Sequence, residues 1–457
     1  MGTCDGSCAT LKKHMLLITT VAFGVLLNPL NSSMIAVGLS RIQQDFQLSY
    51  SDASWLISTY YLSSAVAQPV MGKLSDLFGK KRLFMLGLIL IVIASVLAPF
   101  SPGFGWLLGF RMIQAIGSST LFPAGMGIIR HVITENQAKA LGTLSIFSSV
   151  SAAFGQSIGG FLIHFGDWPA IFLINFPFII VSFLLAIKVL PKDPVREKQQ
   201  IKLDYIGILL FTGMIVSWLL FLLGLETAFS WWKLALSILL SIVFYLFEAK
   251  NKEPFVDVLA LQKNKNVTFV YLQFILINIV FYSVFFGVPT FLQDKMHLES
   301  NITGILMLAV AGFGVIIAPL AGKWIDANGS KPILLVGSVS IILGTLMLLT
   351  IRPDSSYVWI FFALSILGVS NGFNNIGMQT ALYSFVTQEE TGTASGLFMT
   401  SRYIGTILSS SLLGILFGKE VTTSHFHMIG VVGAIVGIAV LLLTIRMPNK
   451  KKANSTA

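Results

Sequence analysis

The chain has 457 residues, of which 55% are hydrophobic and 11% are charged, and its formal net charge is +10. Soluble domains usually carry about 25% charged residues. This composition therefore excludes a water-soluble fold and favours an all-α polytopic membrane protein, whose helices satisfy their own backbone groups within lipid.

Fourteen apolar runs follow one another along the chain, and a spanning helix needs about 20 mostly apolar residues. They start near residues 14, 53, 83, 104, 138, 168, 205, 230, 267, 301, 333, 356, 393 and 425. The first run is too long, and too polar in its second half, to be a signal peptide, and no small-residue cleavage site follows it. We therefore expect 14 transmembrane helices.

A polar tail, residues 1–13, precedes the first run and contains the two cysteines of the chain, Cys4 and Cys8. We expect this tail to be unstructured, with neither a disulfide framework nor a metal site. The six histidines lie in or near loops without the spacing of metal ligands around an acid. We expect no cofactor and no metal in the protein.

One charged loop occurs twice, at residues 72–82 and again at residues 322–332, an offset of 250 residues without a gap. The matching positions are Gly72 with Gly322, Asp76 with Asp326, Gly79 with Gly329, and Lys81 with Lys331. A repeated loop between apolar runs indicates a duplicated helical bundle. Such duplication is typical of transporters in which one half rocks against the other around a central site.

The offset pairs the second run with the tenth and the third with the eleventh, so the seventh and eighth runs belong to neither half. The expected arrangement is therefore six, two and six helices. The expected parts are a cytoplasmic tail (1–13), an N-terminal six-helix bundle (14–191), a basic linker with two extra helices (192–265), a C-terminal six-helix bundle (266–446) and a basic cytoplasmic tail (447–457).

The lysines and arginines fix the expected orientation. With 14 spans, 23 of the 30 fall on the side that holds both termini and both repeated loops. The opposite side receives five: Arg41, Lys233, Lys295, Arg352 and Lys419. Positive residues collect on the cytoplasmic side, so both termini are expected to be cytoplasmic. The positive net charge is thus a topology signal, and we expect no nucleic-acid partner.

The repeated loop is the expected cytoplasmic gate, formed by Gly72, Asp76, Gly79, Lys81 and Arg82 with Gly322 and Asp326 of the second copy. The first glycine allows close helix packing, the aspartate can meet a helix N-terminus, and the second glycine suits a turn with positive φ. The cations would hold the turn at anionic headgroups. The alternative is a plain basic turn that serves topology alone.

Charges within or near the spans are the candidates for proton coupling. Arg111 and Arg402 fall inside spans, where a charge is costly and indicates function. Gln114 shares a helix face with Arg111. Among the acidic residues, Asp52 and Glu226 are also candidates. An arginine that snorkels to the interface is the alternative for Arg111.

Two further sets complete the candidates. Gly155, Gly159 and Gly160 have the small-residue spacing of tight helix packing, and a close seam can act as a hinge. Uncharged polar residues inside spans avoid lipid, so we expect them to line a substrate cavity; they are Asn28, Asn31, Tyr60, Asn175, Asn371, Asn374, Asn375 and Gln379. Hydrogen bonding between helices, without a substrate, is the alternative.

These residues resemble the major facilitator superfamily, and most closely its fourteen-span drug:proton antiporters. The loop over residues 72–82 resembles the signature between spans two and three. Arg111, Gln114 and Gly117 match a span-four motif linked to proton coupling, and the glycines at 155, 159 and 160 match a span-five motif of antiporters. The resemblance implies export by alternating access, driven by inward proton movement.

The chain departs from this family pattern at two positions. Gln156 stands where the span-five motif usually has proline, and Asn31 stands where span one often has aspartate. No carboxylate is then expected near the membrane midplane, and the least remote are Asp52, Asp76, Glu226 and Asp326. This favours neutral, zwitterionic or anionic substrates over cationic ones.

The leading hypothesis is a monomeric, proton-coupled exporter of drugs or other amphiphiles in a bacterial cell membrane. Its partners would be small-molecule substrates, protons and a bilayer with anionic headgroups. The first alternative is a transporter of a single endogenous metabolite on the same scaffold. A membrane enzyme or sensor is disfavoured, because the chain has no metalloprotease, nucleophile-elbow or phosphate-loop motif and no sizeable soluble domain.

Overall fold

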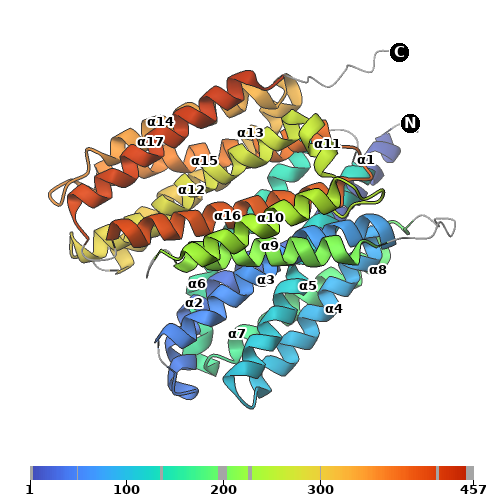
Figure 1. Cartoon of the computed structure of the whole chain (residues 1–457), viewed down its shortest axis with the longest axis horizontal. Helices are drawn as coiled ribbons and strands as arrows, with labels where there is room; N and C mark the ends of the chain where they lie inside the picture. The colour runs from blue at the N-terminus through green and yellow to red at the C-terminus, as the bar shows by residue number, and fades with distance from the viewer. Residues whose placement is uncertain are drawn as a thin grey trace. The chain divides into compact units, whose positions relative to one another are not determined.

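The computed structural model describes residues 4–448 except for 49, 134–136, 194–202, 225–228, 299 and 418–420. Within that part of the chain the secondary structure is helical, with 17 α-helices, one short 3-10 helix and no strand (Figure 1). The first helix, α1, begins at Cys4. The expectation of an unstructured tail over residues 1–13 is therefore wrong for the described residues of that tail.

The helices of the N-terminal half cover the first six apolar runs. They are α1 (Cys4–Val25), α2 (Leu27–Asp45), α3 (Tyr50–Phe78), α4 (Lys80–Leu97), the 3-10 turn η1 (Ala98–Phe100), α5 (Phe104–Val132), α6 (Gln137–Gly166), α7 (Ala170–Leu173) and α8 (Asn175–Val189). The first run is divided between α1 and α2, and the sixth between α7 and α8.

The remaining helices cover the other eight runs. They are α9 (Tyr205–Gly224), α10 (Trp231–Glu248), the short α11 (Val258–Lys263), α12 (Lys265–Asp294), α13 (Ser300–Asn328), α14 (Ser330–Leu348), α15 (Tyr357–Phe385), α16 (Thr391–Phe417) and α17 (Thr423–Arg446). In the described residues, 11 segments are long and apolar enough to cross a membrane. The helices α3, α6 and α16 are not among them, so the count of 14 spans stays a prediction.

The 250-residue repeat is present in the backbone. Helices α3 and α13 both have 29 residues and end at equivalent positions, and each is followed by a glycine and then by the next helix. The two glycines, Gly79 and Gly329, have φ values of 110° and 84°. The predicted positive φ is therefore confirmed in both copies, and it explains why glycine stands there.

The chain divides into two compact units. Unit 1 contains Met1–Lys202 and Thr387–Thr400, and unit 2 contains Leu203–Val386 and Ser401–Ala457. The middle pair, α9 and α10, is thus grouped with the last helices of the chain. Helix α16 is shared, because its first turns and the loop before it pack within unit 1.

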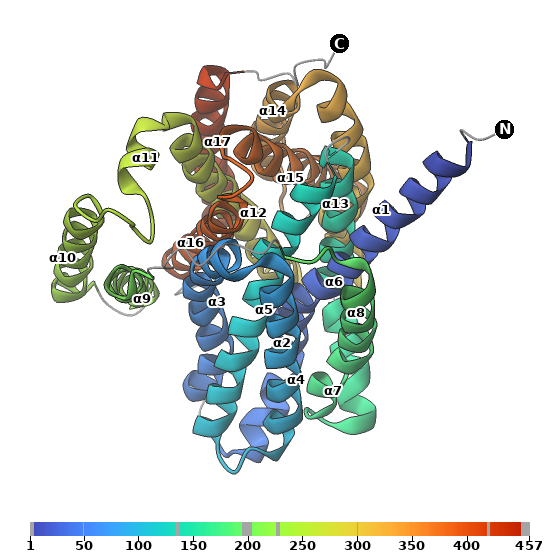
Figure 2. The same cartoon turned by 90° about the vertical axis from the view of Figure 1, so that its right-hand side faces the viewer.

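Unit 1 is built around α5, which packs against α3 and α4, while α6 packs on α2 and α8 on α1 (Figure 2). The α4–α5 contact is close, because a Cβ at Gly87 would lie 2.7 Å from the carbonyl oxygen of Gly117. One apolar cluster joins α2, α3, α5 and α7, and Trp168 and Phe172 are both buried in it. This packing holds the polar residues of α5 inside the unit.

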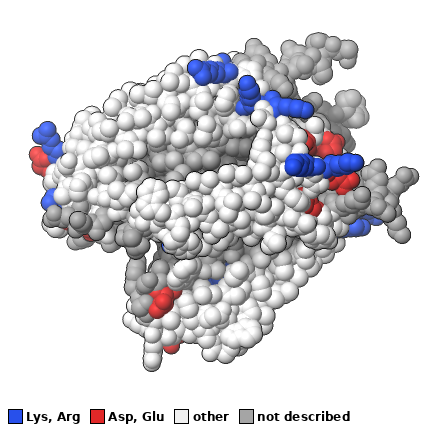
Figure 3. Space-filling view, in the orientation of Figure 1, with Lys and Arg blue, Asp and Glu red and all other residues white. Residues whose placement is uncertain are grey.

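Unit 2 is built around α15, which packs against α13 and α14, while α17 packs on α14 and α12. Phe291 and Phe426 stack in its core, with ring centroids 4.1 Å apart. Helices α9 and α10 lie side by side, and Phe211 contacts Phe244 and Phe255 there. The middle stretches of α10 and α12 carry no charge, and most of the face drawn in Figure 3 is uncharged. A surface of this kind suits lipid.

Candidate functional site

Asp76 lies in the last turn of α3 and binds the first turn of α16. Its Oδ1 accepts a hydrogen bond from the backbone N–H of Gly392 at 3.0 Å. Its Oδ2 accepts from the backbone N–H of Thr393 at 2.8 Å and from the Thr393 hydroxyl at 3.0 Å. The first amide groups of a helix have no partner within the helix and carry a partial positive charge. Asp76 therefore caps α16, and we call this contact the latch.

Small residues let the two helices of the latch approach closely. A Cβ at Gly72 would lie 2.7 Å from the carbonyl carbon of Gly392 and still closer to its oxygen. A Cβ at Gly396 would lie 2.6 Å from the Cα of Pro69. Further along, the Thr400 hydroxyl donates to the carbonyl oxygen of Ala65 at 2.8 Å. Position 72 thus needs glycine for close approach, as the sequence predicts.

Two cations hold the loop that precedes α16. Arg130, in the last turn of α5, donates through Nη1 to the carbonyl oxygen of Thr387 at 2.7 Å and to the hydroxyl of Thr391 at 2.8 Å. Lys80 Nζ donates to the carbonyl oxygen of Gln388 at 3.1 Å. Arg130 was not predicted as a functional residue. The available signal was its place in the last turn of a helix that also carries Arg111.

A polar pocket of about 380 Å³ lies beside the latch within unit 1. Its titratable lining residues are Asp76, Lys80, Arg82, His131, Lys192, Asp193 and Glu389. Asp76 lies past the apolar stretch of α3, and burial raises its pKa from 3.8 to about 6 against the opposing effects of the Thr393 and Gly392 amides and Lys80. The latch therefore contains a carboxyl group whose pKa lies above that of an exposed aspartate.

The loop cation Lys81 binds the end of another helix of unit 1. Its Nζ donates to the carbonyl oxygens of Ile187 and Leu190, both at 2.9 Å, at the end of α8. Asp193 in turn accepts from the backbone N–H groups of Lys81 and Arg82 at 2.9 and 3.0 Å, and so caps α4. Lys81 thus binds the unpaired carbonyl groups at a helix C-terminus, and its expected contact with headgroups stays a prediction. Arg82 is exposed, as expected.

The second copy of the loop repeats part of this arrangement. Lys331 Nζ donates to the carbonyl oxygen of Ile445, at the end of α17, at 2.7 Å. Gly322 is buried in α13, and Asp326 is half-buried in its last turns, at the positions that correspond to Gly72 and Asp76. The lysine cap is therefore common to both repeats.

Arg111 lies two turns into α5 and is 1% exposed. Its Nη1 donates to Oε1 of Gln114, which confirms that the two share a helix face. The guanidinium carbon lies 4.3 Å from the centroid of the Tyr60 ring, a cation–π contact. Arg111 is not a snorkelling residue, because its head group is enclosed within unit 1.

The polar residues expected to line a cavity in the N-terminal half form two hydrogen-bonded groups inside unit 1. Gln114 Nε2 donates to Oδ1 of Asn31 at 3.0 Å, and Asn175 Nδ2 donates to the same oxygen at 2.9 Å. Asn28 and Tyr60 both bind the hydroxyl of Ser118, at 3.1 and 2.9 Å. In this conformation the residues therefore satisfy one another, as the alternative of hydrogen bonding between helices predicts, and their place in a substrate cavity stays a prediction.

The remaining candidates for proton coupling do not gather around Arg111. Asp52 lies exposed in the first turn of α3, and it is not among the contacts of Arg111. Arg402 is half-buried on the part of α16 that belongs to unit 2. Glu226 lies outside the described residues. No acidic side chain contacts Arg111 in the part of the chain that the structure describes.

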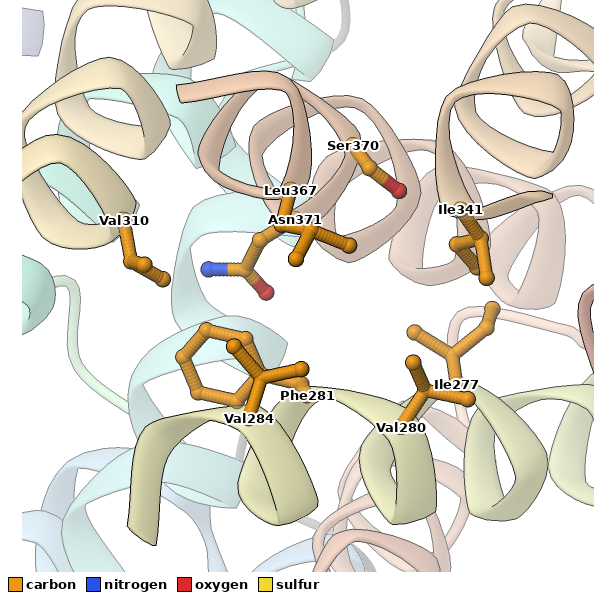
Figure 4. A pocket seen from close by; sticks show the side chains of 9 residues that line it. All are labelled: Ile277, Val280, Phe281, Val284, Val310, Ile341, Leu367, Ser370 and Asn371. Atoms are coloured by element: carbon orange, nitrogen blue, oxygen red, sulfur yellow. The ribbon is translucent and has the colours of Figure 1, made fainter. Parts of the chain in front are cut away.

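Unit 2 contains a small, mostly apolar pocket of about 20 Å³ between α12 and α15. Asn371 lines it, and its side chain points into the space facing Phe281 of α12 (Figure 4). Asn374 does not line the pocket, because it is buried and donates to Ser370. The other two candidates, Asn375 and Gln379, are also absent from its lining.

Glycines on α6 bring that helix close to α2. A Cβ at Gly159 would lie 3.1 Å from the Cα of Met34, and one at Gly155 would overlap the hydroxyl of Ser33. Gly160 lies on the same helix. The predicted tight packing is confirmed for Gly155 and Gly159, and their role as a hinge stays a prediction.

A chain whose described residues form helices only, with a duplicated charged loop and many apolar helices, belongs to the class of helical membrane transporters. The model of the Major Facilitator Superfamily matches residues 21–410. The chain therefore belongs to the major facilitator superfamily, and its family and fold are those of transporters and not of enzymes.

Three relatives and one solved structure illustrate the similarity. The chain is 45% identical to the uncharacterized MFS-type transporter YwoD of Bacillus subtilis, over 97% of this chain and 99% of that one. It is 28% identical to the riboflavin transporter RibZ of Clostridioides difficile, over 90% of each. It is 27% identical to the multidrug transporter protein MdtP of Bacillus subtilis, over 88% of this chain and 75% of that one. The human organic anion transporter MFSD10 has the same fold, with a TM-score of 0.69, 13% identity and coverage of 94% and 99%.

Proposed function

We propose that this protein exports drugs or other amphiphilic small molecules from bacterial cells in exchange for protons. The latch carries the proposal: a titratable carboxylate at the end of α3 caps α16, a helix that the two units share. A transporter that alternates its access needs a contact of this kind, which forms in one state and breaks in the other. A named multidrug transporter among the relatives supports drugs as the substrate class.

The proposed topology has 14 spans, in the order six, two and six, with both termini cytoplasmic. A helix lies over every one of the expected apolar runs, which supports this count. Single cysteines placed in successive loops, on a background with Cys4 and Cys8 replaced by serine, would test it. Labelling by a membrane-impermeant maleimide must alternate between the two sides of the membrane along the chain, and two adjacent loops on one side would contradict the proposal.

Proton coupling is proposed for Asp76, with Arg111, which Gln114 orients, as the charged centre of the N-terminal bundle. A carboxyl group must exchange its proton near ambient pH to couple, and the Asp76 pKa of about 6 meets that requirement. Arg111 supplies a fixed positive charge inside the bundle. The electrochemical proton gradient would be the energy source, with no cofactor, and the functional unit would be a monomer.

Drug-driven proton movement in inside-out vesicles tests this function. Addition of a substrate drug should release protons from acidified vesicles, and Asp76→Asn should reduce this release while Asp52→Asn should not. Proton release that survives both Asp76→Asn and Arg111→Ala would refute the assignment of coupling to these residues.

Transport of one endogenous metabolite is the second candidate, and the similarity to a riboflavin transporter favours it. A panel of drugs and nutrients, compared in cells that express or lack the protein, distinguishes the two. Saturable movement of one nutrient without any drug efflux would replace the first candidate with the second.

A further inference from the structure

One edge of the Arg111 guanidinium has no hydrogen-bond acceptor among the described residues. Nη1 binds Gln114, while Nε and Nη2 have no partner, although the side chain is 1% exposed. Nε and Nη2 form the side edge of the guanidinium, and their N–H bonds run parallel. This spacing matches the two oxygens of a carboxylate, which such an edge binds in a bidentate manner.

The surroundings of Arg111 supply orientation but no negative charge. Tyr60 covers one face of the guanidinium, and Tyr61 is the other titratable neighbour. Gln114 fixes the plane through Nη1, and Asn31 holds Gln114 in turn. No carboxylate compensates the buried charge within the described part of the chain. A buried charge without a counter-charge is costly, so this site favours an anion that arrives from outside.

We propose that Arg111 binds the carboxylate of a transported substrate side-on, through Nε and Nη2. This inference rests on the proposed transport function and names organic carboxylates as a substrate class. The edge is enclosed in the present conformation, so the substrate reaches it when the surrounding helices separate. Neutralisation of Arg111 by the bound carboxylate then gives the loaded and the empty protein different conformational preferences.

A matched pair of probes tests the proposal on the purified protein in lipid nanodiscs. The probes are 2-naphthoate and 2-naphthamide, which share a shape and differ in charge, and empty nanodiscs correct for partitioning into lipid. The wild type should bind 2-naphthoate about tenfold or more tightly than 2-naphthamide, the ratio expected for a bidentate charged pair. Arg111→Lys keeps the charge but lacks the two parallel N–H donors, so it should lose most of this preference. Arg111→Gln should lose all of it. Arg352→Gln removes an exposed arginine of unit 2 and should bind as the wild type does.

The preference for 2-naphthoate over 2-naphthamide is measured on the wild type, so it tests carboxylate binding even if an Arg111 variant fails to fold. Equal binding of the two probes, or no binding of 2-naphthoate by the wild type, would overturn the proposal. Undiminished preference in a folded Arg111→Gln would do so as well. Efflux of a neutral drug coupled to protons, without carboxylate binding, would overturn this inference and leave the proposed function standing. Carboxylate binding at Arg111 without any proton-coupled transport would overturn the proposed function and leave the binding site at Arg111 standing.

Discussion

The replacement Gly72→Ala should open the latch. The added Cβ would lie 2.7 Å from the carbonyl carbon of Gly392 and closer to its oxygen. Non-bonded carbon atoms prefer about 3.5–4.0 Å, so α3 and the first turn of α16 must separate by roughly 1 Å. Neighbouring backbone atoms cannot relieve this clash as a flexible side chain could.

The size of the effect follows from the bonds that this separation stretches. Asp76 accepts its hydrogen bonds from Gly392 and Thr393 at 2.8–3.0 Å, and an increase of roughly 1 Å places all three beyond hydrogen-bonding distance. Each is worth about 0.5–1.5 kcal/mol. The total loss is about 3 kcal/mol, which shifts the equilibrium between latched and open states about a hundredfold.

Cysteine accessibility measures this shift. On a background with Cys4 and Cys8 replaced by serine, Ala394→Cys places a thiol at a position that is 5% exposed while the latch is closed. Gly72→Ala should raise its rate of reaction with a membrane-impermeant maleimide in inside-out vesicles at least tenfold. Gly312→Ala is the matched control, because a Cβ at this glycine of α13 would meet nothing within 4 Å. Reaction at the unchanged rate in Gly72→Ala would refute the role of close packing in the latch.

Three further predictions concern the charges of the latch. Asp76→Asn should impair drug efflux more than Asp326→Asn, because the first loop keeps Lys80 and Arg82 where the second has Ser330 and Pro332; equal losses in a resistance assay would mean that both loops are scaffolding. The raised pKa of Asp76, about 6 against 3.8 for an exposed aspartate, means that the closed latch binds a proton more tightly than the open one. The closed state should therefore be most stable below about pH 4 and lose roughly 3 kcal/mol as the pH rises to 6. Thiol labelling at position 394 should rise over this pH range in the wild type relative to Asp76→Asn, which cannot titrate at this position. Parallel curves of labelling rate against pH in the two proteins would contradict a role for the Asp76 proton. Arg130→Gln should raise the same labelling a few-fold, because it removes the bonds to Thr387 and Thr391, which solvent at the half-buried guanidinium reduces to about 1 kcal/mol together. Arg130→Lys should restore part of the contact, and no change in either variant would show that Arg130 does not hold the loop.

The repeat and its turns could be predicted because their causes are local. Glycine at 79 and 329 is visible in the sequence, and a positive φ is a property of the residue and its neighbours. The apolar runs likewise predict helices, since a backbone in lipid must satisfy its own hydrogen bonds. Local patterns of this kind predict where the helices lie along the chain without any knowledge of their contacts.

The partner of Asp76 could not be predicted, because it lies more than 300 residues away in the chain. The sequence predicts that a carboxylate at the end of α3 can cap a helix, but it does not show which helix N-terminus that carboxylate binds. Thr387 and Glu390 carry the spacing of a capping box, and Glu390 accepts from both the amide and the hydroxyl of Thr387. That signal could have marked this loop as the start of α16, although not as the partner of α3.

The buried amides show a second limit of sequence reasoning. A polar residue within an apolar helix indicates that its side chain does not face lipid, yet it does not distinguish a cavity from another side chain. Asn31 accepts from Gln114 and Asn175, whereas Asn371 lines a pocket. The two asparagines have similar surroundings in sequence, and only the packing of neighbouring helices separates their roles.

The two halves of the repeated loop have separate tasks. The lysine after the turn binds the end of the last helix of its own bundle in both copies, Lys81 at α8 and Lys331 at α17. These bonds join helices that need not move relative to each other, so they fix the turn. The aspartate before the turn binds residues 387–400, which precede the rest of α16 in unit 2. A change of Lys81 should therefore lower stability in every conformation, whereas a change of Asp76 should alter the balance between conformations.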